Sequence, residues 1–269
     1  MRWAPRVGTL RRMRKLLGIL VLLVSAGGPA TAAETLQPTV VLVHGAWADG
    51  SSWDRVIPLL QAKGLRVVAV QNPMTSLADD VAATQRVIAS QLGPVVLVGH
   101  SWAGTVITEA GTDPKVAALV YVAAFAPDVG QSINDLGKGG PAPPGLSAVR
   151  PDGTGFLYLT ANGVSKDFAQ DLPVGQSNVM ASTQGPISAK AFDEKVGRAA
   201  WKTKPSWYVV AENDRMIQPE LERTMAKKIG ARTTSLPSSH VVMLSHPNEV
   251  AAVILNAAAS VKPTKAVNP

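Results

Sequence analysis

Residues 94–104 read PVVLVGHSWAG, an apolar, β-branched run that leads into small residues around a serine. The run Pro94–Val98 predicts a buried strand of a parallel sheet, and Thr105–Ala110 can begin a helix. A serine on a tight turn between a strand and a helix is lifted out of the backbone for attack, and small neighbours let the two elements pass closely. This pattern makes Ser101 the candidate nucleophile.

One position departs from the G-x-S-x-G pattern of such turns. Ala103 stands where the second glycine belongs, and Gly104 follows it. One methyl group is a mild departure, but it weakens the motif taken alone. An ordinary strand-to-helix turn therefore stays open as the alternative.

The positive charge of the chain is concentrated before Glu34, the first acidic residue. The formal net charge is +7, and six of the 26 Lys and Arg residues lie in this segment. An apolar run, Leu16–Val24, follows them, and Ala30 and Ala32 form an A-x-A cleavage signal. This order predicts a secretory signal peptide over residues 1–32. The apolar run is too short to favour a membrane-spanning helix, although an uncleaved anchor is the alternative.

Removal of residues 1–32 leaves 20 basic and 19 acidic residues, a net charge of about +1. The mature chain thus has no basic footprint for nucleic acid, and no stable membrane insertion is expected after cleavage. We expect a periplasmic or secreted protein. Arg11-Arg12 would suit a twin-arginine signal, but Sec export is favoured because Arg14 and Lys15 follow where apolar residues are expected. The chain has no cysteine, which excludes disulfides, cysteine nucleophiles and thiolate metal sites.

The rest of the chain alternates short apolar strands with amphipathic segments. Six strands separated by helices predict an α/β fold with a doubly wound, mostly parallel six-stranded sheet. A chain of 269 residues can bury one large core, so residues 33–269 are expected to form one domain. The expected strands are Thr39–Val43, Arg66–Val70, Pro94–Val98, Val116–Ala123, Ser206–Ala211 and Ala231–Leu236, and the expected helices are Ser52–Ala62, Leu77–Leu92, Thr105–Ala110, Pro219–Lys228 and Pro247–Ser260.

A long insertion, at about residues 128–204, interrupts this alternation. Its first part is rich in Gly and Pro, and Pro151-Asp152-Gly153 suggests a small hairpin turn before a short strand at Phe156–Leu159. Short helical pieces are expected around Asp167 and over Ala189–Val196. An insertion of this length between sheet strands predicts a cap over the site rather than a second globular domain.

Functional residues of a parallel sheet collect at the carboxyl ends of its strands. Asp214 follows the fifth expected strand and His240 follows the sixth. A serine hydroxyl needs an imidazole to take its proton, and the imidazole needs a carboxylate to fix its tautomer. Ser101, Asp214 and His240 are therefore the candidate catalytic triad, in the chain order that this strand arrangement allows. Asp128, after the fourth strand, is the rival carboxylate, and either Asp214 or His240 could be an ordinary loop residue.

An acyl-transfer intermediate also needs donors for its oxyanion. The backbone N–H of Trp102, directly after the serine, can supply one, and that of Ala46 after His44-Gly45 can supply the other. Trp47 and Trp102 are candidates for the wall of an acyl pocket, although packing tryptophans are equally expected. From the cap, Phe156, Tyr158 and Met180 are the candidate substrate-binding residues.

The sequence predicts neither a metal nor a cofactor. Four histidines without an H-E-x-x-H pattern and without cysteines form no credible metal site. A dinucleotide-binding fold is disfavoured because the first strand-to-helix turn, Gly45–Gly50, lacks the G-x-G-x-x-G spacing.

Four segments together resemble the α/β-hydrolase superfamily: residues 41–47 (VLVHGAW), 99–104 (GHSWAG), 213–214 (ND) and 239–247 (SHVVMLSHP). The resemblance spans Thr39–Ser260 and is strongest to small esterases of the plant methylesterase and hydroxynitrile lyase branch and their bacterial relatives. In the lyases of that branch a lysine typically follows the catalytic histidine and a threonine lines the oxyanion loop. Val241 and Ala46 stand in those places here, which favours ester hydrolysis over cyanohydrin cleavage.

The resulting hypothesis is an exported serine hydrolase that cleaves small to medium carboxylic esters through an acyl-enzyme. Its partner would be a small-molecule ester. Two alternatives remain: a cofactor-free lyase or perhydrolase on the same scaffold, and a non-catalytic binding protein with this fold. The sequence does not determine the physiological substrate, the preference among ester, amide and lactone, or the oligomeric state.

Overall fold

A computed structural model describes residues 1, 4 and 35–265 of the chain. The expected signal peptide, residues 1–32, lies outside the described residues apart from Met1 and Ala4. Within the described residues, no helix has the length and apolar character needed to cross a membrane.

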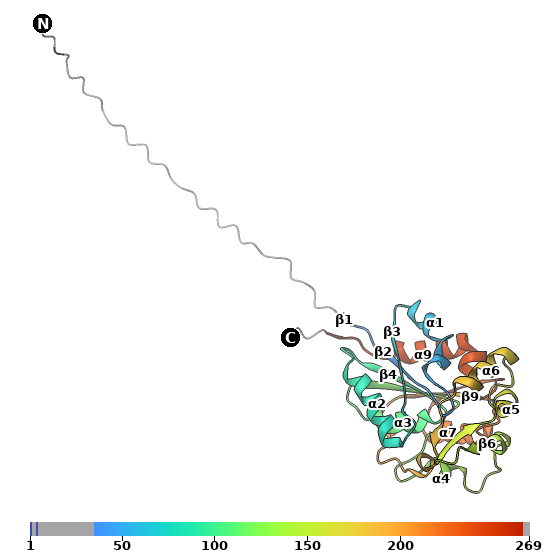
Figure 1. Cartoon of the computed structure of the whole chain (residues 1–269). Coiled ribbons are helices and arrows are strands. Elements are labelled where there is room, and N and C mark those ends of the chain that lie inside the picture. The colour runs from blue at the N-terminus through green and yellow to red at the C-terminus, as the bar shows by residue number, and fades with distance from the viewer. Residues whose placement is uncertain (2–3, 5–34, 266–269) are drawn as a thin grey trace. The chain divides into compact units, whose positions relative to one another are not determined.

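A six-stranded parallel sheet forms the centre of the fold, as predicted (Figure 1). Its strand order is β10-β9-β5-β4-β2-β3, and every neighbouring pair is parallel. The carboxyl ends of all six strands therefore lie at one edge of the sheet. The strands are β2 (Thr39–Val43), β3 (Arg66–Val70), β4 (Val95–His100), β5 (Val116–Val122), β9 (Ser206–Ala211) and β10 (Arg232–Leu236), and a separate antiparallel pair joins β1 (Thr35–Leu36) to β11 (Thr264–Lys265).

Helices cover both faces of the sheet, so the sheet is doubly wound (Figure 1). Helices α1 (Ile57–Gln61) and α9 (Pro247–Ala259) contact each other on one face, and α2 (Leu77–Ala89) and α3 (Ala103–Ala110) contact each other on the other. Helix α7 (Pro219–Lys228) lies against β9, and the short α8 (Val242–Ser245) precedes α9.

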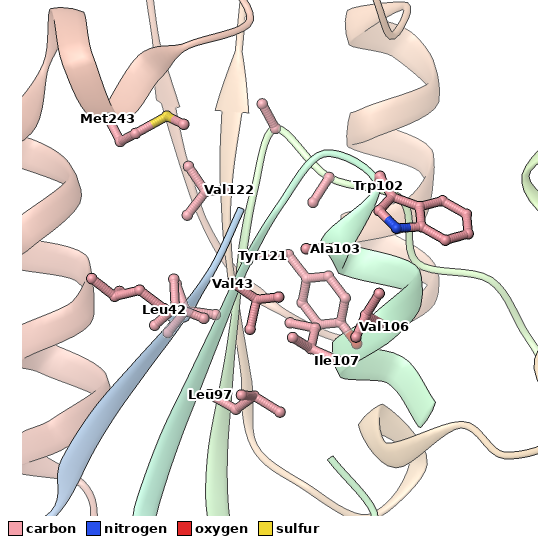
Figure 2. Packing of buried hydrophobic residues seen from close by; sticks show 14 of the residues in the cluster. Leu42, Val43, Leu97, Trp102, Ala103, Val106, Ile107, Tyr121, Val122 and Met243 are labelled. Atoms are coloured by element: carbon pink, nitrogen blue, oxygen red, sulfur yellow. The ribbon is translucent and has the colours of Figure 1, made fainter. Parts of the chain in front are cut away.

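The strands are continuous apolar runs because both of their faces are covered. Leu42 and Val43 are both fully buried, and they point to opposite faces of β2, with Val43 on the side of α3 (Figure 2). On that side, Val106 and Ile107 of α3 face the sheet, and Tyr121 of β5 lies between them and Val43. This two-sided core fixes the strand register and, with it, the loops that follow each strand.

The segment between β5 and β9 has its own small antiparallel sheet, of order β6-β7-β8. The predicted strand Phe156–Leu159 is β7, and the predicted hairpin joins it to β6. Apart from these strands, the segment contains short helical turns and one longer helix, α6. In chain order its elements are α4 (Ile133–Gly137), η2 (Pro144–Ala148), β6 (Val149–Pro151), β7, α5 (Ala161–Gly163), η3 (Val164–Phe168), α6 (Val174–Thr183), β8 (Ile187–Ser188), η4 (Ala189–Asp193) and η5 (Ala200–Lys202).

The expected helix Ser52–Ala62 is broken in the structure. A short 3-10 turn, η1 (Gly50–Trp53), comes first, and its Asp49 side chain accepts a hydrogen bond from the N–H of Ser51. Pro58 lies in the first turn of α1. A proline has no N–H to donate and its ring clashes with the preceding turn, so the chain does not continue as one helix, and α1 begins anew at Ile57 with Pro58 in its first turn.

The turn at the end of β4 explains why Ala103 is tolerated and why a glycine follows it. Gly104 lies directly against the backbone after β5: a Cβ at this position would overlap the Phe125 carbonyl oxygen and come within 2.9 Å of the Ala124 Cβ. Gly104 is thus the position that cannot carry a side chain, whereas the methyl group of Ala103 is accommodated in the core.

We expect Gly104→Ala to lower the free energy of unfolding by about 3 kcal/mol, because the new methyl group overlaps backbone that cannot move aside cheaply. The matched control is Gly175→Ala in α6, where a Cβ would meet nothing within 4 Å. That variant should be neutral or slightly stabilising. Urea denaturation of both variants measures the difference, and equal stabilities would contradict the close approach at Gly104.

Candidate active site

Ser101 lies on a strained turn between β4 and α3. Its φ is +53°, in the left-handed region that few residues other than glycine adopt. The turn is held by three backbone hydrogen bonds: the Ser101 N–H donates to the Val122 carbonyl (3.2 Å), and the Ser101 carbonyl accepts from Gly104 (2.9 Å) and Phe125 (3.2 Å). Strained backbone of this kind persists only where its surroundings fix it, and it is frequent at active sites.

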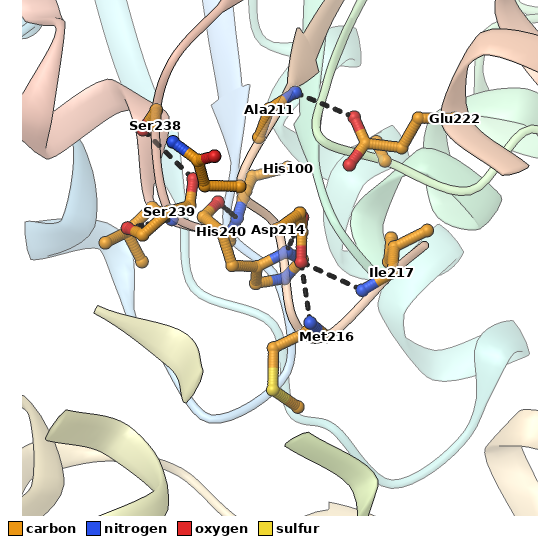
Figure 3. Close-up of polar contacts among 12 residues, drawn as sticks. His100, Ala211, Asp214, Met216, Ile217, Glu222, Ser238, Ser239 and His240 are labelled. Atoms are coloured by element: carbon orange, nitrogen blue, oxygen red, sulfur yellow. Dashed lines mark hydrogen bonds and ion pairs between the residues drawn. The ribbon is translucent and has the colours of Figure 1, made fainter. Parts of the chain in front are cut away.

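His240 and Asp214 form a buried hydrogen-bonded pair (Figure 3). The imidazole Nδ1 lies 2.5 Å from Asp214 Oδ2. The other carboxylate oxygen, Oδ1, accepts from the N–H groups of Met216 (2.6 Å) and Ile217 (2.9 Å). These bonds fix the carboxylate, and the carboxylate in turn fixes the imidazole.

The rival carboxylate Asp128 is elsewhere. Its side chain pairs with Lys202 Nζ at 2.6 Å and is about one-third exposed. The imidazole of His240 is therefore partnered by Asp214 and not by Asp128.

The pairing decides which nitrogen of His240 can act as a base. Because Asp214 accepts a hydrogen bond from Nδ1, the proton of the neutral ring lies on Nδ1 and Nε2 carries the lone pair. In the described part of the chain, Nε2 of His240 is buried and has no hydrogen-bond partner. Ser101 Oγ is thus not hydrogen-bonded to this nitrogen: the structure closes the bond between His240 and Asp214 but not one between the serine and the histidine.

His100 connects the serine turn to the His240 loop. The residue directly precedes Ser101, its ring lies 4.8 Å from the His240 ring, and its Nε2 donates to the His240 carbonyl at 3.0 Å. Burial lowers the pKa of His100 well below its ordinary value, so the ring is neutral and serves as a structural link.

The loop after β2 lies against the serine turn. A Cβ on Gly45 would come within 2.8 Å of the Ser101 Cβ, so only glycine permits this approach. His44 holds the loop: its Nδ1 donates to the Gly45 carbonyl (3.0 Å), and its Nε2 accepts from the Asn72 N–H (2.9 Å). Burial lowers the pKa of His44, which keeps Nε2 available as an acceptor.

The two predicted oxyanion donors belong to the segments just described. Ala46 follows Gly45, and Trp102 follows Ser101. In the part of the chain that the structure covers, the backbone N–H of neither residue has a hydrogen-bond acceptor. Both N–H groups are thus without an acceptor from the described part of the protein.

Aromatic side chains from the insertion cover this edge of the sheet. The Phe168 ring lies 5.0 Å from the His240 ring, and the Phe192 ring lies 5.8 Å from Trp102 and 6.2 Å from Trp47. The Trp47 indole N–H donates to the Leu157 carbonyl of β7 at 3.0 Å. The insertion therefore packs against this edge of the sheet.

The four predicted pocket residues separate into two pairs. Trp47 and Met180 line one cleft of about 120 Å³ between η1 and α6, together with Gln176 and Leu244. Phe156 and Tyr158 do not line it, because they alternate along β7 with Leu157 and Leu159, which face the core; Tyr158 is 38% exposed. Sequence reasoning missed Phe168 and Phe192, and the only available signal was that three of the four phenylalanines lie in the insertion.

A second buried carboxylate, Asp80 of α2, holds Trp102. Asp80 Oδ2 accepts from the Trp102 indole N–H (2.7 Å), and Oδ1 accepts from the Met74 N–H (2.8 Å). Burial raises the pKa of Asp80 to about 6. The hydrogen bonds from Trp102 and Met74 oppose this effect, because they stabilise the ionised carboxylate.

No group of three or more histidine, aspartate or glutamate side chains within the described ranges could hold a metal ion. His246 lies 3.9 Å from Glu249 at the start of α9, away from the pair that His240 forms.

Comparison with known proteins gives a family and several relatives. The model of the alpha/beta hydrolase family matches residues 40–253. The chain is 28% identical to a carbendazim hydrolyzing esterase of Nocardioides sp. (78% of this chain and 96% of the relative) and 25% identical to methylesterase 2 of Arabidopsis thaliana (71% and 84%). Its fold matches the crystal structure of a pyrethroid hydrolase from Sphingobium faniae with a TM-score of 0.72 at 24% identity, over 83% of this chain and 98% of that one.

The raised pKa of Asp80 predicts how stability depends on pH. The folded-state pKa of about 6 exceeds the ordinary value of 3.8, so the folded protein binds the proton more tightly. Below pH 4 Asp80 is protonated in both the folded and the unfolded state, and its stabilising contribution is complete. As the pH rises through 6 this contribution is lost, which lowers the free energy of unfolding by about 3 kcal/mol. Asp80→Asn removes this titration. The stability of the native sequence relative to Asp80→Asn should therefore fall between pH 4 and pH 7.

The neighbouring Asp79 provides the control. Hydrogen bonds from Thr75 and Ser76 lower its pKa, so its contribution is present at neutral pH and lost as the pH falls. Asp79→Asn should change the pH dependence in the opposite sense. Thermal unfolding at a series of pH values measures both, and parallel curves for Asp80→Asn and the native sequence would refute the buried titration.

Proposed function

The chain belongs to the alpha/beta hydrolase family, and from that premise we propose that it is a serine esterase that cleaves small to medium carboxylic esters through an acyl-enzyme. Relatives that this chain matches over most of their length are named as esterases and hydrolases, which supports this assignment. The observation that carries it is the buried bond between His240 and Asp214, next to a serine turn with φ of +53°.

In the first step of the proposed mechanism, Ser101 Oγ attacks the ester carbonyl carbon. Its proton passes to His240 Nε2, the nitrogen left basic by the Asp214 bond. Asp214 stays ionised and stabilises the imidazolium, while its bonds to Met216 and Ile217 keep it in place.

The carbonyl oxygen becomes an oxyanion in the tetrahedral intermediate. The N–H groups of Ala46 and Trp102 would donate to it, and a lost donor of this kind typically costs roughly 3–4 kcal/mol of transition-state stabilisation. As the intermediate collapses, the imidazolium gives its proton to the leaving alkoxide. A water molecule, activated by the same nitrogen, then hydrolyses the acyl-enzyme.

The aromatic cover favours apolar ester substrates. Trp47, Phe168 and Phe192 surround the region next to the serine turn, and apolar walls with few polar groups are typical of pockets for small organic molecules. Phe156 and Tyr158 stay candidates for the outer part of the substrate path.

We also propose export, on the strength of the basic and apolar N-terminal segments. The N-terminal residue of the protein recovered from the producing cells tests this: it should be Ala33, and a retained Met1 would contradict cleavage.

Ser101→Ala should abolish hydrolysis of p-nitrophenyl acetate and butyrate while leaving the far-UV circular dichroism spectrum unchanged, because it removes the attacking oxygen and no core contact. A residual rate close to that of the native protein would rule out Ser101 as the nucleophile.

The carboxylate is tested by a matched pair of variants in the same assay. Asp214→Asn should lower kcat by about 10⁴-fold, because the amide stabilises the wrong tautomer of the histidine. Asp128→Asn, which breaks only the pair with Lys202, should stay within about threefold of the native rate. The reverse ranking would assign the role to Asp128.

A further inference from the structure

Glu222 is a fully buried glutamate on α7, close to the candidate triad but not part of it (Figure 3). One of its oxygens, Oε2, accepts from the Ala211 N–H at 3.0 Å. Within the described residues, the other oxygen, Oε1, is buried and has no partner among the N–H and O–H donors. A buried polar oxygen without a hydrogen-bond partner is rare in folded proteins, so the position of Glu222 needs an explanation.

The charged groups around Glu222 do not compensate a negative charge. Arg223, the next residue of α7, pairs with Glu220 and Glu212 at the surface. Tyr208 of β9 faces Glu222 as a buried neutral phenol, whose hydroxyl bonds to Ala124. The remaining neighbour, Asp214, is itself an anion.

Burial, and then the neighbouring Asp214 carboxylate, raise the pKa of Glu222 well above its ordinary value. Two carboxyl groups in contact inside a protein do not both ionise, because their charges repel in a medium of low dielectric constant. Asp214 accepts three hydrogen bonds as an anion, so Glu222 is the member of the pair that keeps a proton.

The hydrogen-bonding capacity of Asp214 fits such a donor. An ionised carboxylate has about four lone-pair sites. The imidazole of His240 and the N–H groups of Met216 and Ile217 occupy three. The fourth is open to an O–H donor, and in Figure 3 the Glu222 carboxyl group points into the site, toward Ala211 and Asp214.

We propose that Glu222 is a positioning residue: a neutral carboxylic acid that accepts from the Ala211 N–H and donates its own proton to the Asp214 carboxylate. This inference rests on the proposed triad, since it assigns Glu222 a role in holding the triad's acid. The donated bond fixes the fourth side of Asp214 and draws part of its negative charge toward Glu222. The carboxylate therefore attracts the imidazolium less strongly than a carboxylate without this bond would.

Two substitutions separate this role from simple packing. Glu222→Gln keeps both bonds, because the amide oxygen accepts from Ala211 and the amide N–H donates to Asp214. Glu222→Met keeps the length of the side chain but removes both. Glu220→Leu, on the exposed side of the same helix, is the matched control.

The kinetic test compares kcat, KM and the pH profile of kcat/KM for p-nitrophenyl butyrate. Glu222→Met should lower kcat about tenfold with KM within about twofold, and should move the acidic limb of the profile upward by about half a pH unit or more. Glu222→Gln should recover most of the lost rate and the native limb. Equal losses in both variants, or an unmoved limb in Glu222→Met, would overturn the proposal.

The direct test is infrared spectroscopy at pH 8 and needs no catalysis. At this pH Asp80, with a pKa of about 6, is largely ionised. The native protein should show the carbonyl stretch of a protonated carboxylic acid, shifted in D₂O, and Glu222→Gln should lack it. No band in the native protein, or a band that survives in Glu222→Gln, would refute a protonated Glu222. Because this result is independent of turnover, it distinguishes an error about Glu222 from an error about esterase activity, which Ser101→Ala tests.

Discussion

A buried imidazole can act as a base at Nε2 only if the proton on Nδ1 has an acceptor, and for His240 that acceptor is Asp214. The pair is closed to solvent, so its geometry depends on the protein and not on water. The bonds from Met216 and Ile217 to Asp214 are set by the loop after β9, and His240 comes from the loop after β10. The pairing of these two adjacent strands thus determines the tautomer of the histidine, and the proposed chemistry follows from that tautomer.

The same edge of the sheet concentrates the backbone strain of the chain. Four residues other than glycine have a positive φ in the described part of the chain: Trp47, Met74, Ser101 and Ala123. Each comes shortly after the end of a strand, β2, β3, β4 and β5 in that order. The apolar core below them keeps the strands in register, which allows their loops to hold conformations that would be unfavourable alone.

Local sequence patterns predicted those features of the fold that depend on residues adjacent in the chain, above all the bounds of strands. The strands Arg66–Val70, Ser206–Ala211 and Phe156–Leu159 were predicted with the bounds they have, because apolar period and turn residues are local signals. The break between η1 and α1 was missed although Pro58 marked it. The roles of Phe168, Asp80 and Glu222 could not be predicted, because they come from contacts between different elements of the fold, with His240, Trp102 and Ala211 respectively.

Covalent labelling measures the central claim most directly, because only a serine activated by a correctly oriented base reacts with a fluorophosphonate. Intact-mass and peptide analysis of the native protein should find one phosphonyl group, on the peptide that contains Ser101. His240→Gln should prevent the labelling while the fold persists. No label on the folded native protein, or a label that survives in Ser101→Ala, would contradict the account.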